Sequence, residues 1–85
     1  MTTVPTPDQI DTAARLLHDL AAPYGLTRLH HGDEPGEIVA DVEPGRTYMD
    51  IARFELDIED RFGWAINVTS ARAPRARAGP AITSH

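Results

Sequence analysis

The fold is decided by residues 37–63, which read EIVADVEPGRTYMDIARFELDIEDRFG. In residues 37–42, apolar side chains recur at every second position, which predicts a strand with one apolar face. The run Glu43-Pro44-Gly45 consists of turn formers and ends this strand. The sequence therefore predicts a strand over residues 37–42 and a break directly after it.

The segment after the break is predicted to be a helix. Thr47, followed three residues later by Asp50, is a capping pattern that marks a helix start. The apolar residues of the segment partly alternate, as they would in a strand. Length nevertheless favours a helix, because roughly 15 residues without a breaker exceed a usual strand. Gly63 is a typical C-terminal cap.

This helix carries two apolar stripes on opposite sides. The first consists of Ile51, Phe54, Ile58 and Phe62. The second consists of Met49, Ala52 and Leu56. Two interpretations of the second stripe stay open: it packs against an N-terminal helix, or part of it is a partner-binding surface. In the latter case, replacing Met49 and Leu56 together by Asp removes partner binding and leaves a cooperative fold.

Upstream, a helix and a second strand are expected. Thr6-Pro7-Asp8-Gln9 has the pattern of a helix start, with a capping threonine, a proline in the first turn and the glutamine of a capping box. Apolar residues then recur at helical spacing over residues 10–20, and Pro23 ends the helix. Residues 26–31 are predicted to be a short strand, and residues 32–36 are dense in turn formers.

Downstream, Trp64, Ile66 and Val68 are expected on one face of a final strand. After Ser70 the chain consists of Ala, Arg, Pro and Gly without a period, which predicts a flexible basic tail over residues 71–85. Residues 1–70 are therefore expected to form one α/β (α+β) domain. It consists of a small three-stranded mixed sheet with two helices packed on one face. Its other face is expected to be thinly covered, and either that face or the second stripe of the long helix should bind a partner or a second copy.

Charge is unevenly distributed along the chain. All 13 acidic residues lie between Asp8 and Asp60, together with five of the eight arginines, so this segment carries a net charge of −8. The remaining arginines, Arg72, Arg75 and Arg77, lie in the predicted tail. An acidic body disfavours direct binding of nucleic acid, because such binding begins with neutralisation of phosphates. It favours a basic protein partner.

Composition also bears on location. The first residues contain neither a basic region nor an apolar run, as a signal peptide would. The apolar stretches are far shorter than the ~20 residues that span a bilayer. The chain has no cysteine, which suits a reducing compartment. We therefore expect a cytoplasmic protein that does not cross a membrane.

Three stretches carry a resemblance to a known family. They are residues 21–29, which contain Tyr24-Gly25-Leu26, residues 41–47, which read DVEPGRT and open the long helix, and residues 65–69, which read AINVT. Together with the order of elements, they resemble the core of the minimal nucleotidyltransferases of the bacterial antitoxin type. In that family a Gly-Ser turn holds nucleotide phosphates, and three aspartates on neighbouring strands hold Mg²⁺. The resemblance implies a nucleotidyltransferase-like core.

The chain departs from the family at each catalytic position. It contains no Gly-Ser pair. The positions that correspond to the paired aspartates are Pro35 and Glu37, and the third corresponds to Asn67. Proline offers no metal ligand and asparagine only a neutral one, so these positions are interpreted as vestigial, with no cofactor. A slipped register would instead recruit Asp33 or Glu34.

The resemblance also implies a partner. Antitoxins of this family pair with small helical RNase toxins of the HEPN type, some by transferring AMP to the toxin and others partly by binding it. The first hypothesis is a non-catalytic protein that neutralises such a toxin by complex formation through Met49, Ala52 and Leu56, or that binds a second copy of itself. The alternatives are an active nucleotidyltransferase, which uses Mg²⁺ and ATP, and a decayed fragment without function.

Overall fold

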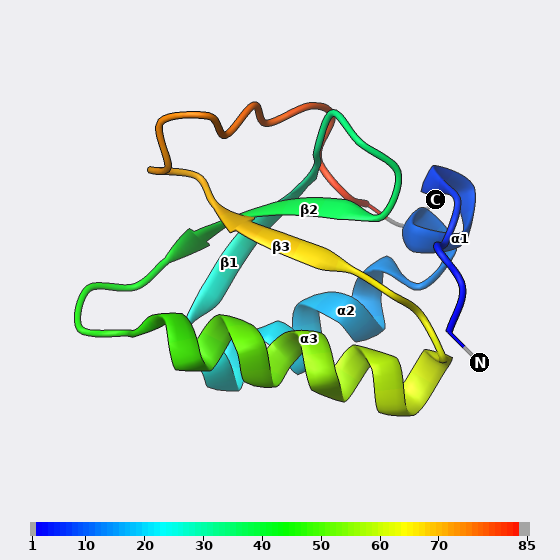
Figure 1. The fold of residues 1–85 in the computed structure, drawn as a ribbon, viewed down its shortest axis with the longest axis horizontal. Coiled ribbons are helices and arrows are strands. Elements are labelled where there is room, and N and C mark those ends of the chain that lie inside the picture. The colour runs from blue at the N-terminus through cyan, green and yellow to red at the C-terminus, as the bar shows by residue number, and fades with distance from the viewer. Residues whose placement is uncertain (1, 84–85) are drawn as a thin grey trace.

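The computed structural model describes residues 2–83. The elements follow in the order α1 (Pro7–Thr12), α2 (Ala14–Ala21), a 3₁₀ helix η1 (Ala22–Tyr24), β1 (Leu26–His31), β2 (Glu37–Val42), α3 (Tyr48–Phe62) and β3 (Asn67–Ser70). Within these described residues the protein has the predicted α+β architecture, with a three-stranded mixed sheet (Figure 1). No helix between residues 2 and 83 combines the length and the apolar character needed to cross a membrane. Residue 1 of the predicted domain and residues 84–85 of the predicted tail lie outside the described part.

The N-terminal helical region begins where the sequence indicates but is divided in two. The Thr6 hydroxyl accepts a hydrogen bond from the Gln9 N–H at 3.2 Å, and the Gln9 side-chain oxygen accepts one from the Thr6 N–H at 2.9 Å. At Ala13 the backbone leaves helical geometry, with φ −93° and ψ 9°. Its N–H is shared between the carbonyls of Gln9 and Ile10, as is common at helix ends. The single helix expected from the periodicity is therefore two helices, joined at Ala13.

β2 is the central strand of the sheet. It pairs antiparallel with β1 and parallel with β3. The parallel pair requires a crossover connection, which α3 supplies. Ile38 and Ala40 of β2 face the helices and are fully buried, in the alternation that the sequence predicts. β1 bulges between Thr27 and His30, where Arg28 has a positive φ of 51°.

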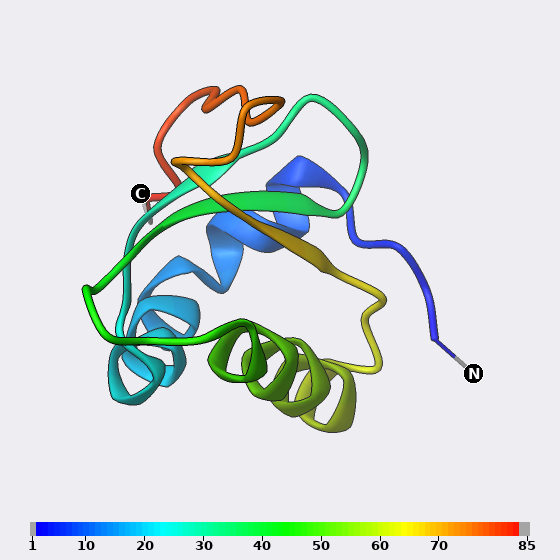
Figure 2. The same ribbon diagram turned by 60° about the vertical axis from the view of Figure 1, so that its left-hand side comes forward.

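α3 begins and ends at the predicted residues. The Asp50 carboxylate accepts a hydrogen bond from the Thr47 N–H at 3.0 Å. Gly63 closes the helix with a φ of 69°, a left-handed conformation that glycine adopts at little cost. The first apolar stripe is buried at Ile51, Phe54 and Ile58 and half-buried at Phe62. α2 and α3 lie on the same side of the sheet (Figures 1 and 2).

One apolar core lies between the sheet and the helices. Its buried members are Ile10, Ala14, Leu17 and Ala21 from α1 and α2, Leu26, Leu29, Ile38, Ala40 and Val68 from the sheet, Ile51, Phe54 and Ile58 from α3, and Ile82. The rings of Tyr24 and Phe54 meet at its end, with centroids 6.2 Å apart and planes tilted by 52°. Burial of these side chains is the main force that holds the helices on the sheet.

The structure corrects the expectation of a free tail. Residues 79–82 run antiparallel to β1, where the His31 N–H donates to the Pro80 carbonyl and the Ile82 N–H donates to the Leu29 carbonyl, both at 2.9 Å. Ile82 is 1% exposed and belongs to the core. The packed part of the chain therefore extends beyond the boundary expected at residue 70. Composition did not reveal this, because a single apolar anchor has no period.

Two further expectations for this part of the chain are wrong. The final strand begins at Asn67, whereas Trp64 lies in the connection from α3, with its backbone beside that of Thr3. The second face of the sheet is not thinly covered at its centre, because Val39 on that face is only 1% exposed. Residues 71–80 lie on the side of the sheet away from α3 (Figure 2).

Candidate functional site

The structure brings together two of the three predicted vestigial positions. Glu37 and Asn67 are register partners at the start of the parallel strands β2 and β3, so their Cα atoms lie side by side. Pro35 lies outside the strands, in the exposed turn that leads into β2. Neighbouring positions on the two strands are thus occupied by one carboxylate and one amide.

The Glu37 carboxylate has a structural role. Its Oε1 accepts a hydrogen bond from the Asp33 N–H at 2.9 Å, which closes the turn between β1 and β2. Gly32 lies so close that a Cβ at this position would collide with the same carboxylate. The backbone of Gly32 adds a further bond to this turn, donating to the Glu37 carbonyl at 2.9 Å. Glu37 is therefore engaged in holding the turn rather than directed at an open site.

These residues do not fit Mg²⁺ with a nucleotide. Hard divalent cations prefer several carboxylate oxygens, and Asn67 contributes at most a neutral amide oxygen. Asp33 and Glu34, which a slipped register would recruit, are exposed in the turn, and Asp33 lies 3.9 Å from the Arg77 guanidinium. Among residues 2–83, no three His, Cys, Asp or Glu side chains gather closely enough to hold a metal ion.

The second apolar stripe of α3 is largely open to solvent. Met49 is 59% exposed and Leu56 is 61% exposed, whereas Ala52 is half-buried. The interpretation that this stripe packs against the N-terminal helix is therefore wrong for Met49 and Leu56. The structure leaves both side chains accessible to solvent, and neither lines the groove described next.

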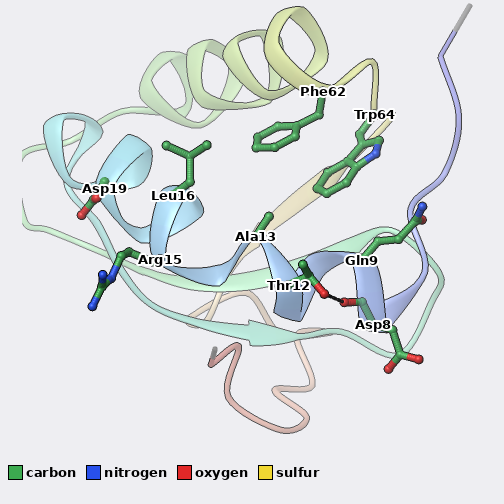
Figure 3. A pocket seen from close by; sticks show the side chains of 9 residues that line it. All are labelled: Asp8, Gln9, Thr12, Ala13, Arg15, Leu16, Asp19, Phe62 and Trp64. Carbon is green, nitrogen blue, oxygen red and sulfur yellow. Dashed lines mark hydrogen bonds between the residues drawn. The ribbon is translucent and has the colours of Figure 1, made fainter. Parts of the chain in front are cut away.

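A groove lies between the N-terminal helices and the C-terminal end of α3 (Figure 3). Its volume is about 720 Å³, and it is lined by Asp8, Gln9, Thr12, Ala13, Arg15, Leu16, Asp19, Phe62 and Trp64. Leu16, Phe62 and Trp64 surround its open space, and the charged side chains lie at its margins (Figure 3). Leu16 is 45% exposed, although it is a large aliphatic residue. The groove is thus an apolar hollow with polar edges, the usual form of a binding site.

The aromatic wall of the groove follows from the end of α3. Gly63 reverses the chain in its left-handed conformation, which places the residues on either side of it face to face. The Phe62 and Trp64 rings stack, with centroids 4.4 Å apart and planes within 14° of parallel. Thr3 fixes the connection, because its N–H donates to the Gly63 carbonyl at 2.9 Å and its carbonyl accepts from the Ala65 N–H at 2.8 Å.

The floor and far wall come from α1 and α2. Ala13 lies at the joint between the two helices, where its small side chain leaves space that a longer one would fill. Leu16 extends toward Phe62 across this space (Figure 3). The side chain of Thr12 is turned back to its own helix, donating to the Asp8 carbonyl at 2.9 Å. The groove is therefore built from two parts of the chain that are about 50 residues apart.

Sequence reasoning missed this site. It placed Phe62 in the first apolar stripe of the long helix and Trp64 on one face of a strand, and the structure leaves both half-buried. A signal was present, because Ala13, Leu16 and Leu20 recur at helical spacing beside the stripe that faces the sheet. An N-terminal helix with so wide an apolar surface needs a second neighbour besides the sheet.

Comparisons of the chain with models of protein families, with curated proteins and with solved structures found no match in any of the three.

Proposed function

We propose that this chain is a non-catalytic binding protein that acts by forming a complex with another protein. The observation that carries the proposal is the open apolar groove walled by Leu16, Phe62 and Trp64. Burying such side chains contributes about 25 cal/mol for each Å² removed from water, so a partner that fills the groove is stabilised there. Apolar hollows in which a few polar groups lie at the edge are the usual form of binding sites.

The arrangement at Glu37 and Asn67 supports a role without nucleotidyl transfer. Transfer of a nucleotide needs fixed anionic ligands for the metal ions that neutralise the phosphates. Here one carboxylate holds a turn and its neighbour is an amide. The resemblance to the minimal nucleotidyltransferases then suggests the kind of complex, in which the protein neutralises a HEPN-type RNase toxin by binding rather than by modification.

Co-expression with the product of the adjacent gene tests this function. The protein, carrying an affinity tag, is expected to retain that product through purification in a defined ratio and to suppress its RNase activity. In parallel, the purified pair is incubated with labelled ATP and Mg²⁺, and we expect no label on either chain.

Each alternative has its own signature in the same experiment. Label on the partner would establish the active transferase and contradict our proposal. Absence of both complex and label would favour the decayed fragment. Glu37→Gln is a useful control for labelling, because its amide oxygen can still accept from the Asp33 N–H while the negative charge is lost.

A further inference from the structure

We infer that the groove binds a basic amphipathic helical segment, with apolar side chains against Leu16, Phe62 and Trp64 and lysine or arginine side chains beside Asp8 and Asp19. This inference deepens the proposed function, on which it rests, by naming the chemistry of the bound segment. Two independent properties of the structure support it: the location of the net charge and the chemistry of the groove walls.

The net charge of the protein lies entirely on its helices. α1, α2 and α3 contain eight acidic residues and three arginines, a net charge of −5 that equals the net charge of the whole chain. The remainder of the chain contains five acidic residues and five arginines and is neutral. The groove lies between these helices, and their net negative charge favours the approach of a cationic segment.

The carboxylates at the groove margin are available to such a segment. Asp8 and Asp19 are both exposed. Within residues 2–83, no ion pair engages either of them, whereas Asp50 and Asp57 of α3 pair with Arg46 and Arg61 at 3.7 and 3.1 Å. Arg15 is the one cation among the residues that line this groove. The margin can therefore accept two positive charges without first breaking an ion pair.

The walls select for an amphipathic segment that carries arginine or lysine. Leu16 and the stacked rings bury apolar side chains, which a helix presents at i, i+3, i+4 and i+7 along one face. Trp64 lines the groove and is half-buried, and an aromatic ring in such a position can also attract a cation. A second copy of the chain does not meet these requirements with its own helices, because they are acidic.

The single tryptophan of the chain allows a direct test, because it lines the groove. The probe is a tryptophan-free synthetic helical peptide of about 18 residues, with leucines on one face and lysines and arginines along both margins. A second peptide has glutamate in place of every basic residue. Binding to the full chain is followed by the emission of Trp64, and we expect a blue shift on addition of the basic peptide and none with the acidic one.

Two matched variants locate the binding surface. Leu16→Asp places a charge in the groove and is expected to weaken binding of the basic peptide by more than about tenfold. Leu56→Asp makes the same change at a similarly exposed position on α3 outside the groove, and it should leave binding unchanged. Circular dichroism of both variants checks that the fold is retained.

Neutralising Asp8 and Asp19 tests whether these carboxylates attract the basic side chains of the peptide. The double variant Asp8→Asn, Asp19→Asn is expected to weaken binding about three- to tenfold at low ionic strength. At about 1 M salt, where the screening length is about 3 Å, the difference from the unmodified protein should disappear.

Several results would overturn the inference. Equal binding of the acidic peptide would refute the charge argument, and loss of binding in Leu56→Asp but not in Leu16→Asp would move the surface to the second stripe of α3. Failure of the basic peptide to bind at all would refute the inference as a whole. A complex with the adjacent gene product that is insensitive to Leu16→Asp would leave the proposed function standing while this inference fails.

Discussion

Replacing Ile82 by Ala tests whether the last described residues belong to the folded core. The Ile82 side chain is 1% exposed and packs in the same core as α2 and β1. Its backbone is fixed on both sides, because its N–H donates to the Leu29 carbonyl at 2.9 Å and its carbonyl accepts from His18 Nε2 at 2.8 Å. Both backbone contacts survive the substitution, so the variant isolates the contribution of the apolar side chain.

The loss of stability expected for Ile82→Ala follows from the burial of the isoleucine side chain. Removing the aliphatic groups of a buried isoleucine costs about 2–5 kcal/mol, as lost transfer free energy and as a cavity. Because the Ile82 side chain is almost fully buried, we expect a loss within this range, with the free energy of unfolding lower by about 3 kcal/mol. A domain of this size has roughly 4–13 kcal/mol in total, so the loss is a large fraction. The midpoint of thermal unfolding should fall by about 12–24 °C.

Urea unfolding, followed by circular dichroism and by Trp64 fluorescence, measures this loss. Ile82→Val retains most of the side chain and should cost only about 1 kcal/mol. Thr83→Ala is the matched control in the same segment, because Thr83 is exposed, and it should change stability by less than about 0.5 kcal/mol. If Ile82→Ala were as stable as the unmodified protein within that margin, residues 79–82 would not be part of the core and our description of this segment would be refuted.

Three further substitutions test local features. Glu55→Ala removes the carboxylate that accepts from the Val68 N–H at 2.8 Å on the open edge of β3, and it should lower the free energy of unfolding in urea by about 1–2 kcal/mol. Glu55→Gln keeps an acceptor oxygen and should recover most of this loss, so an equal loss in both variants would contradict the role of this hydrogen bond. Gly63→Ala forces a residue with a Cβ into a left-handed conformation and should lower the free energy of unfolding by about 1–2 kcal/mol. The emission of Trp64 should also change, because its stack on Phe62 is disturbed, and unchanged stability and emission would argue against the turn at Gly63. Asp50→Ala removes the acceptor of the Thr47 N–H at the start of α3, and the free energy of unfolding, measured by thermal unfolding, should fall by about 0.5–1 kcal/mol. An unchanged free energy of unfolding would show that α3 does not need this cap.

The sequence alone determined the positions of most elements. β1 and β2 occupy the predicted residues, and α3 runs from the capping pattern at Thr47 to the glycine at position 63. These features could be predicted because their causes are local: a strand alternates over a few residues, and a helix cap needs only side chains three positions apart. The division of the first helix at Ala13 escaped prediction, since its apolar spacing continues through the break.

The interpretation of the candidate functional residues depended on both the sequence and the tertiary structure. The sequence named Glu37 and Asn67 only through the family resemblance, and it is the structure that makes them register partners. Only the structure reveals that the Glu37 carboxylate bonds to the Asp33 N–H, because a side chain's partner depends on the shape of the turn around it. Likewise, the exposure of Met49 and Leu56 could not be read from their spacing, which fits a buried stripe as well as an open one.

The groove and the attachment of residues 79–82 were decided by the tertiary structure alone. Both join parts of the chain that are far apart: the groove joins α1 and α2 to the end of α3, and Ile82 meets Leu29 and His18. The spacing of apolar residues in the sequence indicates which face of a helix or strand is apolar. It does not indicate which distant element of the chain covers that face. Where two apolar surfaces leave a space between them, as at Leu16 and Trp64, only packing in three dimensions reveals it.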